Sequence, residues 1–220
     1  FAAEGLAKLT RRPGLAALTA GPGVTNGVSA VTTAHHNGSP LVVLGGRAAE
    51  EGWGRGALQE FDHVPVMTPV TKWAHTVRAT DDIAADVTAA ARLSMTPHRG
   101  PTFVDLPLDV IFGQGSGNVN DGDLDQSPTG ADPLPGQAGA DPDAVTRAVE
   151  LLARAERPAL LVGSGVYWDG AEAGLVAAAE ALEIPVFANG LGRGLVSADH
   201  HLSFSRVRSL LKPAKPGRPA

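Results

Sequence analysis

The sequence predicts an α/β protein with parallel sheets, because strand-like and helix-like stretches alternate along the chain. The first unit runs from an apolar stretch at residues 15–20 through a helix-like stretch at 28–34 to a strand-like stretch at 41–44. A second unit within residues 159–188 repeats the order strand, helix, strand. Two parallel strands joined by a crossover helix have this order, and open sheets of this kind bind ligands at the carboxyl ends of their strands.

The first half of the chain supplies further elements of one such sheet. Residues 1–9 have the pattern of a helix interior, and residues 81–93 have helical spacing after Thr80, a capping candidate. Residues 70–77 and 102–106 have the pattern of strands, and Pro107 ends the second of these. Together with the first unit, these stretches predict one layered α/β domain.

The turn after the first strand contains Gly21, Pro22 and Gly23. Proline cannot donate a backbone hydrogen bond, and glycine adopts backbone conformations that other residues avoid, so the strand should end here. Thr25 and Asn26 are good capping residues and are expected to begin the next helix. The turn lacks the spacing of a dinucleotide-binding fingerprint, so on its own it supports a ligand site and a purely geometric turn about equally.

A glycine-rich loop at residues 48–61 follows the second strand. Loops of this kind on a rigid scaffold often carry function. Gln59 and Glu60 have apolar neighbours, which favours a helical turn that places one of them inward; an exposed polar pair is the alternative. No histidine of the chain has a second metal ligand at a suitable spacing, and only His63, next to this loop, is a candidate for function.

A linker is expected at residues 113–142, which are rich in Gly, Pro, Asp and Ser. The acidic residues at 120–125 lack the closing glutamate of a calcium loop and are interpreted as solvated linker. Asp143 should cap the first helix of the second half. The buried stripe of that helix should consist of Val145, Val149, Leu151 and Leu152.

Composition limits the possible functions. Hydrophobic residues make up 43% of the 220 residues and charged residues 19%, as in ordinary globular proteins. The net charge of −5 argues against nucleic acid as the main partner. The chain has no cysteine, which fits a cytoplasmic setting, and it shows neither a transmembrane-length apolar run nor a signal peptide.

Seven motifs follow one another along the chain: AAEGLAKLT (2–10), RPG (12–14), TAGPGVTN (19–26), SPL (39–41), GALQEFD (56–62), PVTK (69–72) and GPTFVDLPLDV (100–110). In this order they resemble the pyrimidine-binding domain of thiamine-diphosphate enzymes of the acetolactate synthase group. The second half resembles the Rossmann-like central domain of the same enzymes. The expected organisation is therefore a pyrimidine-binding thiamine-diphosphate domain at 1–112, the linker at 113–142 and part of a central domain at 143–220.

The resemblance implies thiamine diphosphate as cofactor. It places Gly21, Pro22, Gly23 and Asn26 beside the pyrimidine ring and Gln59 opposite the reacting carbon. No residue of this chain receives a catalytic or metal-binding role. In the family, the activating glutamate precedes the point that matches residue 1, and the domain that binds Mg²⁺ and the diphosphate comes later in the chain. Both ends are therefore expected to be truncated, or the reading frame to change near residue 211.

The resemblance implies part of an enzyme that acts on 2-oxo acids, with acetolactate synthase-like carboligation of pyruvate as the first expectation. A carbon–carbon lyase of the 2-hydroxyacyl-CoA lyase or oxalyl-CoA decarboxylase type is the alternative. From another class, a non-catalytic two-domain module could bind a nucleotide or a partner protein. Because the family builds its site between subunits, a homodimer or homotetramer is expected.

The second half departs from true acetolactate synthases in one place. Residues 201–206 stand where those enzymes have a methionine- and glycine-rich stretch. This departure weakens the expectation of FAD in the central domain, where some family members hold FAD and others a CoA-related nucleotide. Residues 212–220 are basic and rich in proline, and they are not expected to form a core element.

Overall fold

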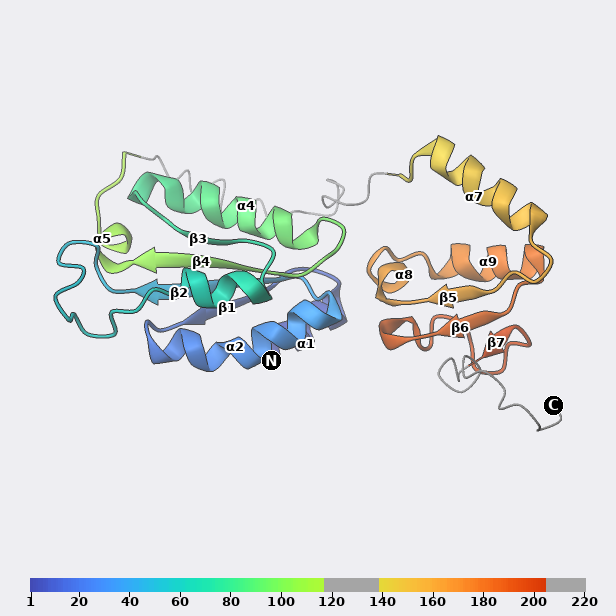
Figure 1. Ribbon diagram of the computed structural model, residues 1–220, viewed down its shortest axis with the longest axis horizontal. Helices are drawn as coiled ribbons and strands as arrows, with labels where there is room; N and C mark the ends of the chain where they lie inside the picture. The colour runs from blue at the N-terminus through green and yellow to red at the C-terminus, as the bar shows by residue number, and fades with distance from the viewer. Residues whose placement is uncertain (117–138, 205–220) are drawn as a thin grey trace, which may run out of the picture. The chain divides into compact units, whose positions relative to one another are not determined.

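The computed structural model describes residues 1–116 and 139–204 (Figure 1). The chain divides into two compact units, Phe1–Ala138 and Gly139–Ala220. Most of the expected linker, with its acidic residues at 120–125, and the proline-rich tail at 212–220 lie outside the described residues.

The first unit is a four-stranded parallel sheet with helices on both faces (Figure 1). The strand order is β1-β2-β4-β3. Its strands are β1 (Gly14–Leu18), β2 (Leu41–Arg47), β3 (Ala74–Thr76) and β4 (Pro101–Pro107). Its helices are α1 (Ala2–Thr10), α2 (Pro22–Asn37), α3 (Val64–Met67), η1 (Thr68–Val70), η2 (Thr80–Asp82), α4 (Ile83–Met95) and α5 (Leu108–Ile111).

Each face of this sheet has its own core, because side chains alternate along a strand. On one face Val43 and Phe103 pack against Val24 and Val31 of α2. On the other face, Val42 and Val104 pack in a cluster with Val77, which directly follows β3, and with Ala90 of α4. The remaining buried members are Ala34, Leu41 and Met67 on the first face and Val110 on the second. The predicted parallel α/β architecture is confirmed, including the pairing of β1 with β2.

The start of α2 differs from the prediction that Thr25 and Asn26 cap it. The helix begins at Pro22, and Gly21 is the N-cap with φ 59° and ψ −116°, so both polar residues lie inside the first turn. The reason is the Gly-Pro pair: the φ of proline suits the first helical position, and Gly21 adopts a backbone conformation that is unfavourable for other residues. The Thr25 hydroxyl donates to the carbonyl oxygen of Pro22 at 3.2 Å instead of accepting from the backbone.

Two further boundaries in the first unit also differ. The strand expected at 70–77 is shortened to β3 because η1 occupies its first residue. Thr80 does not cap α4; it opens η2, and its hydroxyl donates to the carbonyl oxygen of Val110 at 2.7 Å. That bond ties the start of the α4 region to α5.

Lys72, the lysine of the PVTK motif, closes the C-terminal end of α4. Its Nζ donates to the carbonyl oxygens of Leu93 and Thr96 at 2.6 and 2.9 Å, and to the Thr96 hydroxyl at 2.6 Å. Burial and the nearby Arg99 lower the pKa of Lys72. The last carbonyls of a helix lack intrahelical partners, so this lysine has a structural role.

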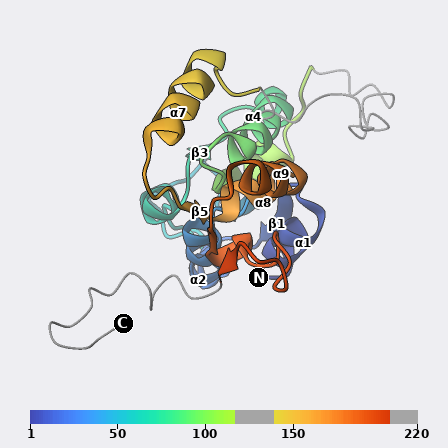
Figure 2. The ribbon, with the colours of Figure 1, turned by 90° about the vertical axis from the view of Figure 1, so that its right-hand side faces the viewer.

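The second unit is a smaller parallel sheet in the order β5-β6-β7. It consists of α7 (Pro142–Arg154), β5 (Leu160–Val162), α8 (Ser164–Trp168), α9 (Glu172–Leu182), β6 (Val186–Ala188), η3 (Gly190–Gly192) and β7 (Ser203–Phe204). Helices α8 and α9 lie side by side next to the sheet (Figure 1, Figure 2). The predicted strand–helix–strand order of this unit is confirmed, since β5 and β6 are parallel neighbours.

Helix α7 differs from its prediction in two ways. Asp141, not Asp143, is the N-cap: its carboxylate accepts from the backbone N–H of Asp143 at 3.1 Å, because Pro142 takes the first helical position. The expected buried stripe is largely uncovered, with Val145, Val149 and Leu151 exposed at 47%, 59% and 71%. Within the described residues, therefore, α7 does not contribute these side chains to a core.

Within residues 1–116 and 139–204, no helix combines the length and the apolar character that crossing a membrane would require.

Glu4 joins α1 to the end of α2. Its buried carboxylate accepts from Asn37 Nδ2 at 2.9 Å and Ser39 Oγ at 3.2 Å, and it pairs with Lys8 Nζ at 2.7 Å. Burial acts to raise the pKa of Glu4, but the hydrogen bonds and charge of these partners outweigh it and hold the pKa below its usual value. Glu4 is thus a structural residue.

We predict that Glu4→Gln lowers the free energy of unfolding at neutral pH by about 1.5–3 kcal/mol, the usual contribution of a hydrogen bond to a charged group. Because the folded-state pKa lies below that of an unfolded glutamate, this contribution is present above the unfolded pKa and is lost as the pH falls through the folded one. Urea unfolding of the unmodified chain and of Glu4→Gln should therefore show a difference in the free energy of unfolding that becomes smaller at acid pH. Glu51→Gln, at an exposed glutamate, is the control, and a difference independent of pH would contradict the charge-based account.

Candidate functional site

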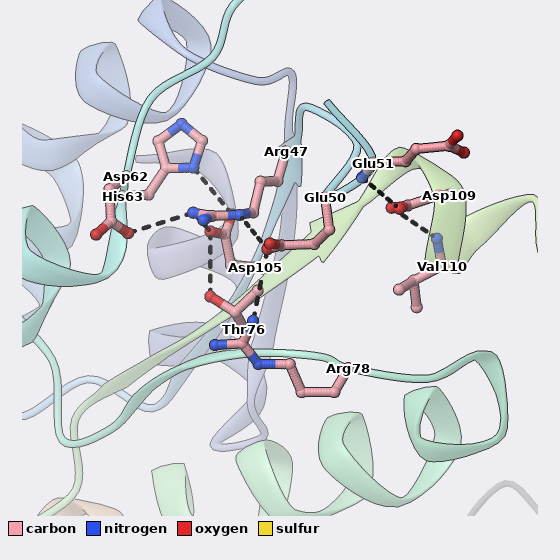
Figure 3. Close-up of polar contacts among 10 residues, drawn as sticks. All are labelled: Arg47, Glu50, Glu51, Asp62, His63, Thr76, Arg78, Asp105, Asp109 and Val110. Atoms are coloured by element: carbon pink, nitrogen blue, oxygen red, sulfur yellow. Dashed lines mark hydrogen bonds and ion pairs between the residues drawn. The ribbon is translucent and has the colours of Figure 1, made fainter. Parts of the chain in front are cut away.

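The carboxyl ends of the parallel strands meet at one edge of the first sheet (Figure 3). Arg47 is the last residue of β2, Thr76 the last of β3, and Asp105 lies two residues before the end of β4. Gly21 follows the end of β1 by three residues. This edge is where open parallel sheets bind ligands.

Asp105 is the centre of a polar network at this edge. Its side chain is completely buried, and its Oδ1 lies 2.9 Å from His63 Nδ1. Its Oδ2 accepts from Arg47 Nη1 at 3.1 Å and from the Thr76 hydroxyl at 3.5 Å. A buried carboxylate is tolerated when it is paired and hydrogen-bonded, and Asp105 has three side-chain partners.

Arg47 connects Asp105 to the glycine-rich loop. Its Nε donates to Glu50 Oε1 at 3.1 Å and its Nη1 to Asp62 Oδ1 at 3.2 Å, while the guanidinium lies 3.8 Å from the centre of the Trp53 ring (Figure 3 shows the three carboxylates). Burial alone would lower the pKa of Arg47, but the three carboxylates raise it. Arg47 thus holds both ends of the loop against the sheet.

His63 carries the network to the start of α2. The ring is completely buried, and its Nε2 accepts from the backbone N–H of Gly21 at 2.9 Å. Because Nε2 is the acceptor, the proton of the neutral ring lies on Nδ1, which donates to Asp105. The rings of Phe61 and Phe103 flank it, with centroids 5.4 and 6.2 Å away.

Two of the predicted site residues, Gly21 and Gln59, are in direct contact. A Cβ added at Gly21 would lie 3.1 Å from the Cβ of Gln59, so the two backbones pack closely. Gly23 lies in the first turn of α2, where an added Cβ would collide with Thr19 Cγ2. Pro22 and Asn26 are exposed and stand four residues apart, which places them on the same side of α2.

The expected helical turn at Gln59 and Glu60 is not found. Gln59 is exposed and adopts φ 60°, an uncommon conformation for a residue other than glycine. Glu60 is only partly buried, and its carboxylate accepts from the backbone N–H of Ala57 at 3.2 Å. The loop glycines allow a tight turn here, and the left-handed Gln59 keeps its backbone against Gly21.

A cleft of about 300 Å³ opens beside the network. Arg47 and Asp62 line one part of it, and His75, Thr76 and Arg78 another. Arg78 lies 3.6 Å from Glu50, so it belongs to the same group of charges. Within this lining Arg47 pairs with Asp62 at 3.2 Å.

The residues at the sheet edge suit a neutral heteroaromatic group better than a metal or a phosphate. Asn26 and Gln59 offer amide donors and acceptors, and Pro22 offers an apolar ring. The carboxylates near this edge already accept hydrogen bonds from Arg47. Among the residues that the structure describes, no group of three or more His, Asp or Glu could hold a metal ion. The aminopyrimidine ring of thiamine diphosphate fits this set of groups.

His63 is a candidate from the sequence alone, whereas Arg47, Asp62, Thr76 and Asp105 are found only in the structure. One signal was present: Asp105 interrupts the apolar stretch of β4, and charged residues are rarely buried unless they are paired. Its partner could not be inferred, because Arg47 is separated from it by 58 positions along the chain.

We predict that Arg47→Met lowers the free energy of unfolding by about 3–5 kcal/mol, because it leaves the buried carboxylate of Asp105 without its cation. Arg78→Met is the matched control. Arg78 is largely exposed and has a 3.6 Å ion pair, so its loss should change stability by less than about 1 kcal/mol. Thermal unfolding of both variants tests this, and equal effects would show that Arg47 is not the cation on which this edge depends.

Comparisons with known proteins relate the chain to thiamine pyrophosphate enzymes. The thiamine pyrophosphate enzyme N-terminal TPP binding domain matches residues 1–66, and the thiamine pyrophosphate enzyme central domain matches residues 145–215. The acetolactate synthase large subunit IlvG of Mycobacterium tuberculosis is 48% identical over 209 residues, covering 95% of this chain and 37% of that protein. The 2-hydroxyacyl-CoA lyase 2 of Bos taurus is 35% identical over 236 residues, covering 94% of this chain and 37% of that protein.

A solved structure is similar over most of the described fold. The thiamine diphosphate-dependent 4-hydroxybenzoylformate decarboxylase of Rhodococcus jostii RHA1 matches with a TM-score of 0.72 and 27% identity, covering 84% of this chain and 34% of that one. The chain thus spans 37% of the length of the curated relatives named above. The two domain models together match more than half of the chain, and with these relatives they show that it belongs to the thiamine pyrophosphate enzyme family.

Proposed function

We propose that this chain is part of a thiamine-diphosphate-dependent enzyme that acts on 2-oxo acids, with acetolactate synthase-like carboligation of pyruvate as its reaction. The observation that carries this proposal is the 48% identity to the Mycobacterium tuberculosis acetolactate synthase large subunit along 95% of the chain. The parallel-sheet edge at Gly21 and Gln59 supports it, because its neutral groups suit the ring end of the cofactor.

Carbon–carbon cleavage in the manner of a 2-hydroxyacyl-CoA lyase is the second candidate. Lyase relatives are 35% identical to the chain along 94% of its length, which is less than for the synthase relative. Comparing acetolactate formation from pyruvate with cleavage of a 2-hydroxyacyl-CoA by the complete enzyme separates the two. A non-catalytic module that binds a nucleotide or partner would do neither.

The proposal gives the chain a binding role and no proton-transfer role. When bound, thiamine diphosphate supplies the carbon nucleophile that adds to the 2-oxo acid. Pro22 would contact the pyrimidine ring, Asn26 would hydrogen-bond at its edge, and Gln59 would orient the substrate. Gly21 and Gly23 would permit the close approach of the backbone.

Other parts of the proposal concern the whole enzyme. Mg²⁺ and the diphosphate would be bound outside residues 1–220, and the enzyme would be a cytoplasmic homodimer or homotetramer. We assign no nucleic-acid or membrane partner. The second unit has a cleft of about 360 Å³ lined in part by Arg193 and Ser203. A CoA-related nucleotide and FAD are the candidate ligands of this unit.

Asn26→Ala should weaken thiamine diphosphate binding by the complete enzyme about tenfold, the equivalent of one hydrogen bond. Thermal stability should not fall, because Asn26 is exposed in a helix where alanine is favourable. His36→Ala, at an exposed position in the last turn of the same helix, is the control. Isothermal titration measures the affinity. Gly23→Val is less suitable as a test, since its side chain would collide with Thr19 and disturb folding.

The purified 220-residue chain should consume no 2-oxo acid when cofactor and Mg²⁺ are added. The reason is that the proposal places the activating glutamate and the diphosphate-binding groups outside these residues. A coupled assay for acetolactate and for carbon dioxide measures this. Turnover that depends on both additions would show that the chain contains a complete site.

A further inference from the structure

The start of α2 depends on a backbone conformation that few residues allow. Gly21 has φ 59° and ψ −116°, and no side chain of a neighbouring residue caps the helix. Its N–H donates to His63 Nε2, a partner 42 residues further along the chain. His63 is therefore the side chain that holds the Gly21 backbone in place.

His63 is itself fixed on its other side. Its Nδ1 donates to Asp105, whose second oxygen is held by Arg47 and Thr76 from two other strands. The ring cannot turn over without breaking two buried hydrogen bonds, each at 2.9 Å. The hydrogen bonds therefore link Asp105 in the sheet to Gly21 through His63, and this link requires the tautomer with the proton on Nδ1.

Gln59 is held against the same point. It lies four residues before His63, and its Cβ and carbonyl oxygen would lie 3.1 and 3.2 Å from a Cβ placed on Gly21. A shift of Gly21 would therefore change the distance between the N-terminus of α2 and Gln59 in the glycine-rich loop. These are the two segments to which we have assigned the cofactor ring.

We propose that His63 is a positioning residue, which sets the spacing between the α2 N-terminus and Gln59 by accepting the Gly21 N–H. The functional consequence rests on the proposed function, whereas the placement of Gly21 does not. A histidine that served only to fill the core would stabilise the fold but would not control Gly21 specifically.

Two substitutions separate these roles in the 220-residue chain. H63Q places an acceptor near the position of Nε2, so it should keep the Gly21 bond. H63N places its amide near the position of Nδ1, so it should keep a donor to Asp105 but lose the bond to Gly21. Hydrogen exchange of the Gly21 amide, measured by ¹⁵N NMR, should rise at least about tenfold in H63N and less than about threefold in H63Q, where tenfold corresponds to one lost hydrogen bond. Equal exchange in the two variants would overturn the proposal.

The unmodified chain gives a test that does not depend on either variant folding. Long-range ¹H–¹⁵N spectra should show His63 protonated on Nδ1 and unprotonated on Nε2. Protonation on Nε2 would overturn the proposal, because that nitrogen could no longer accept from Gly21.

In the complete enzyme, H63N should raise the dissociation constant of thiamine diphosphate about tenfold, and H63Q should largely restore it. If Gly21 responds as expected but cofactor affinity does not, His63 positions Gly21 and the proposed cofactor edge is wrong. If Gly21 does not respond, the positioning role itself is wrong.

Discussion

The buried ion pair between Arg47 and Asp105 is the interaction on which the rest of this sheet edge depends. Removing two charges from water is costly, and the cost is offset only when both are also hydrogen-bonded. Here Thr76 and His63 complete the partners of Asp105, while Glu50 and Asp62 complete those of Arg47. The pair therefore joins three strands, the glycine-rich loop and the start of α2.

This arrangement separates the charged groups from the proposed binding surface. The charged groups pair with one another within the network, while the residues exposed beside Gly21 include Pro22, Asn26 and Gln59. Gly21 connects the network to the proposed binding surface. Its N–H donates to His63, and because it has no side chain, Gln59 can pack closely against its backbone. A rigid charged support beneath a neutral surface is suited to holding an aromatic ring in one orientation.

The sequence was sufficient to predict the layered fold, because apolar stretches and Gly or Pro residues mark the strands and their ends, as at residues 41–44. It was insufficient for helix starts: Pro22 and Pro142 set them, although Thr25 and Asp143 are good caps by composition. The polar network around Asp105 could not be predicted from the sequence for another reason. Its partners come from different strands and loops, and only the folded sheet brings them together.

The most direct test of this account is an experimental structure of the complete enzyme with thiamine diphosphate bound. The account predicts that the aminopyrimidine ring contacts Pro22 and Asn26 beside Gln59, while His63 Nε2 still accepts from the Gly21 N–H. A cofactor ring bound away from this edge, or a His63 ring turned away from Gly21 in the complex, would contradict it.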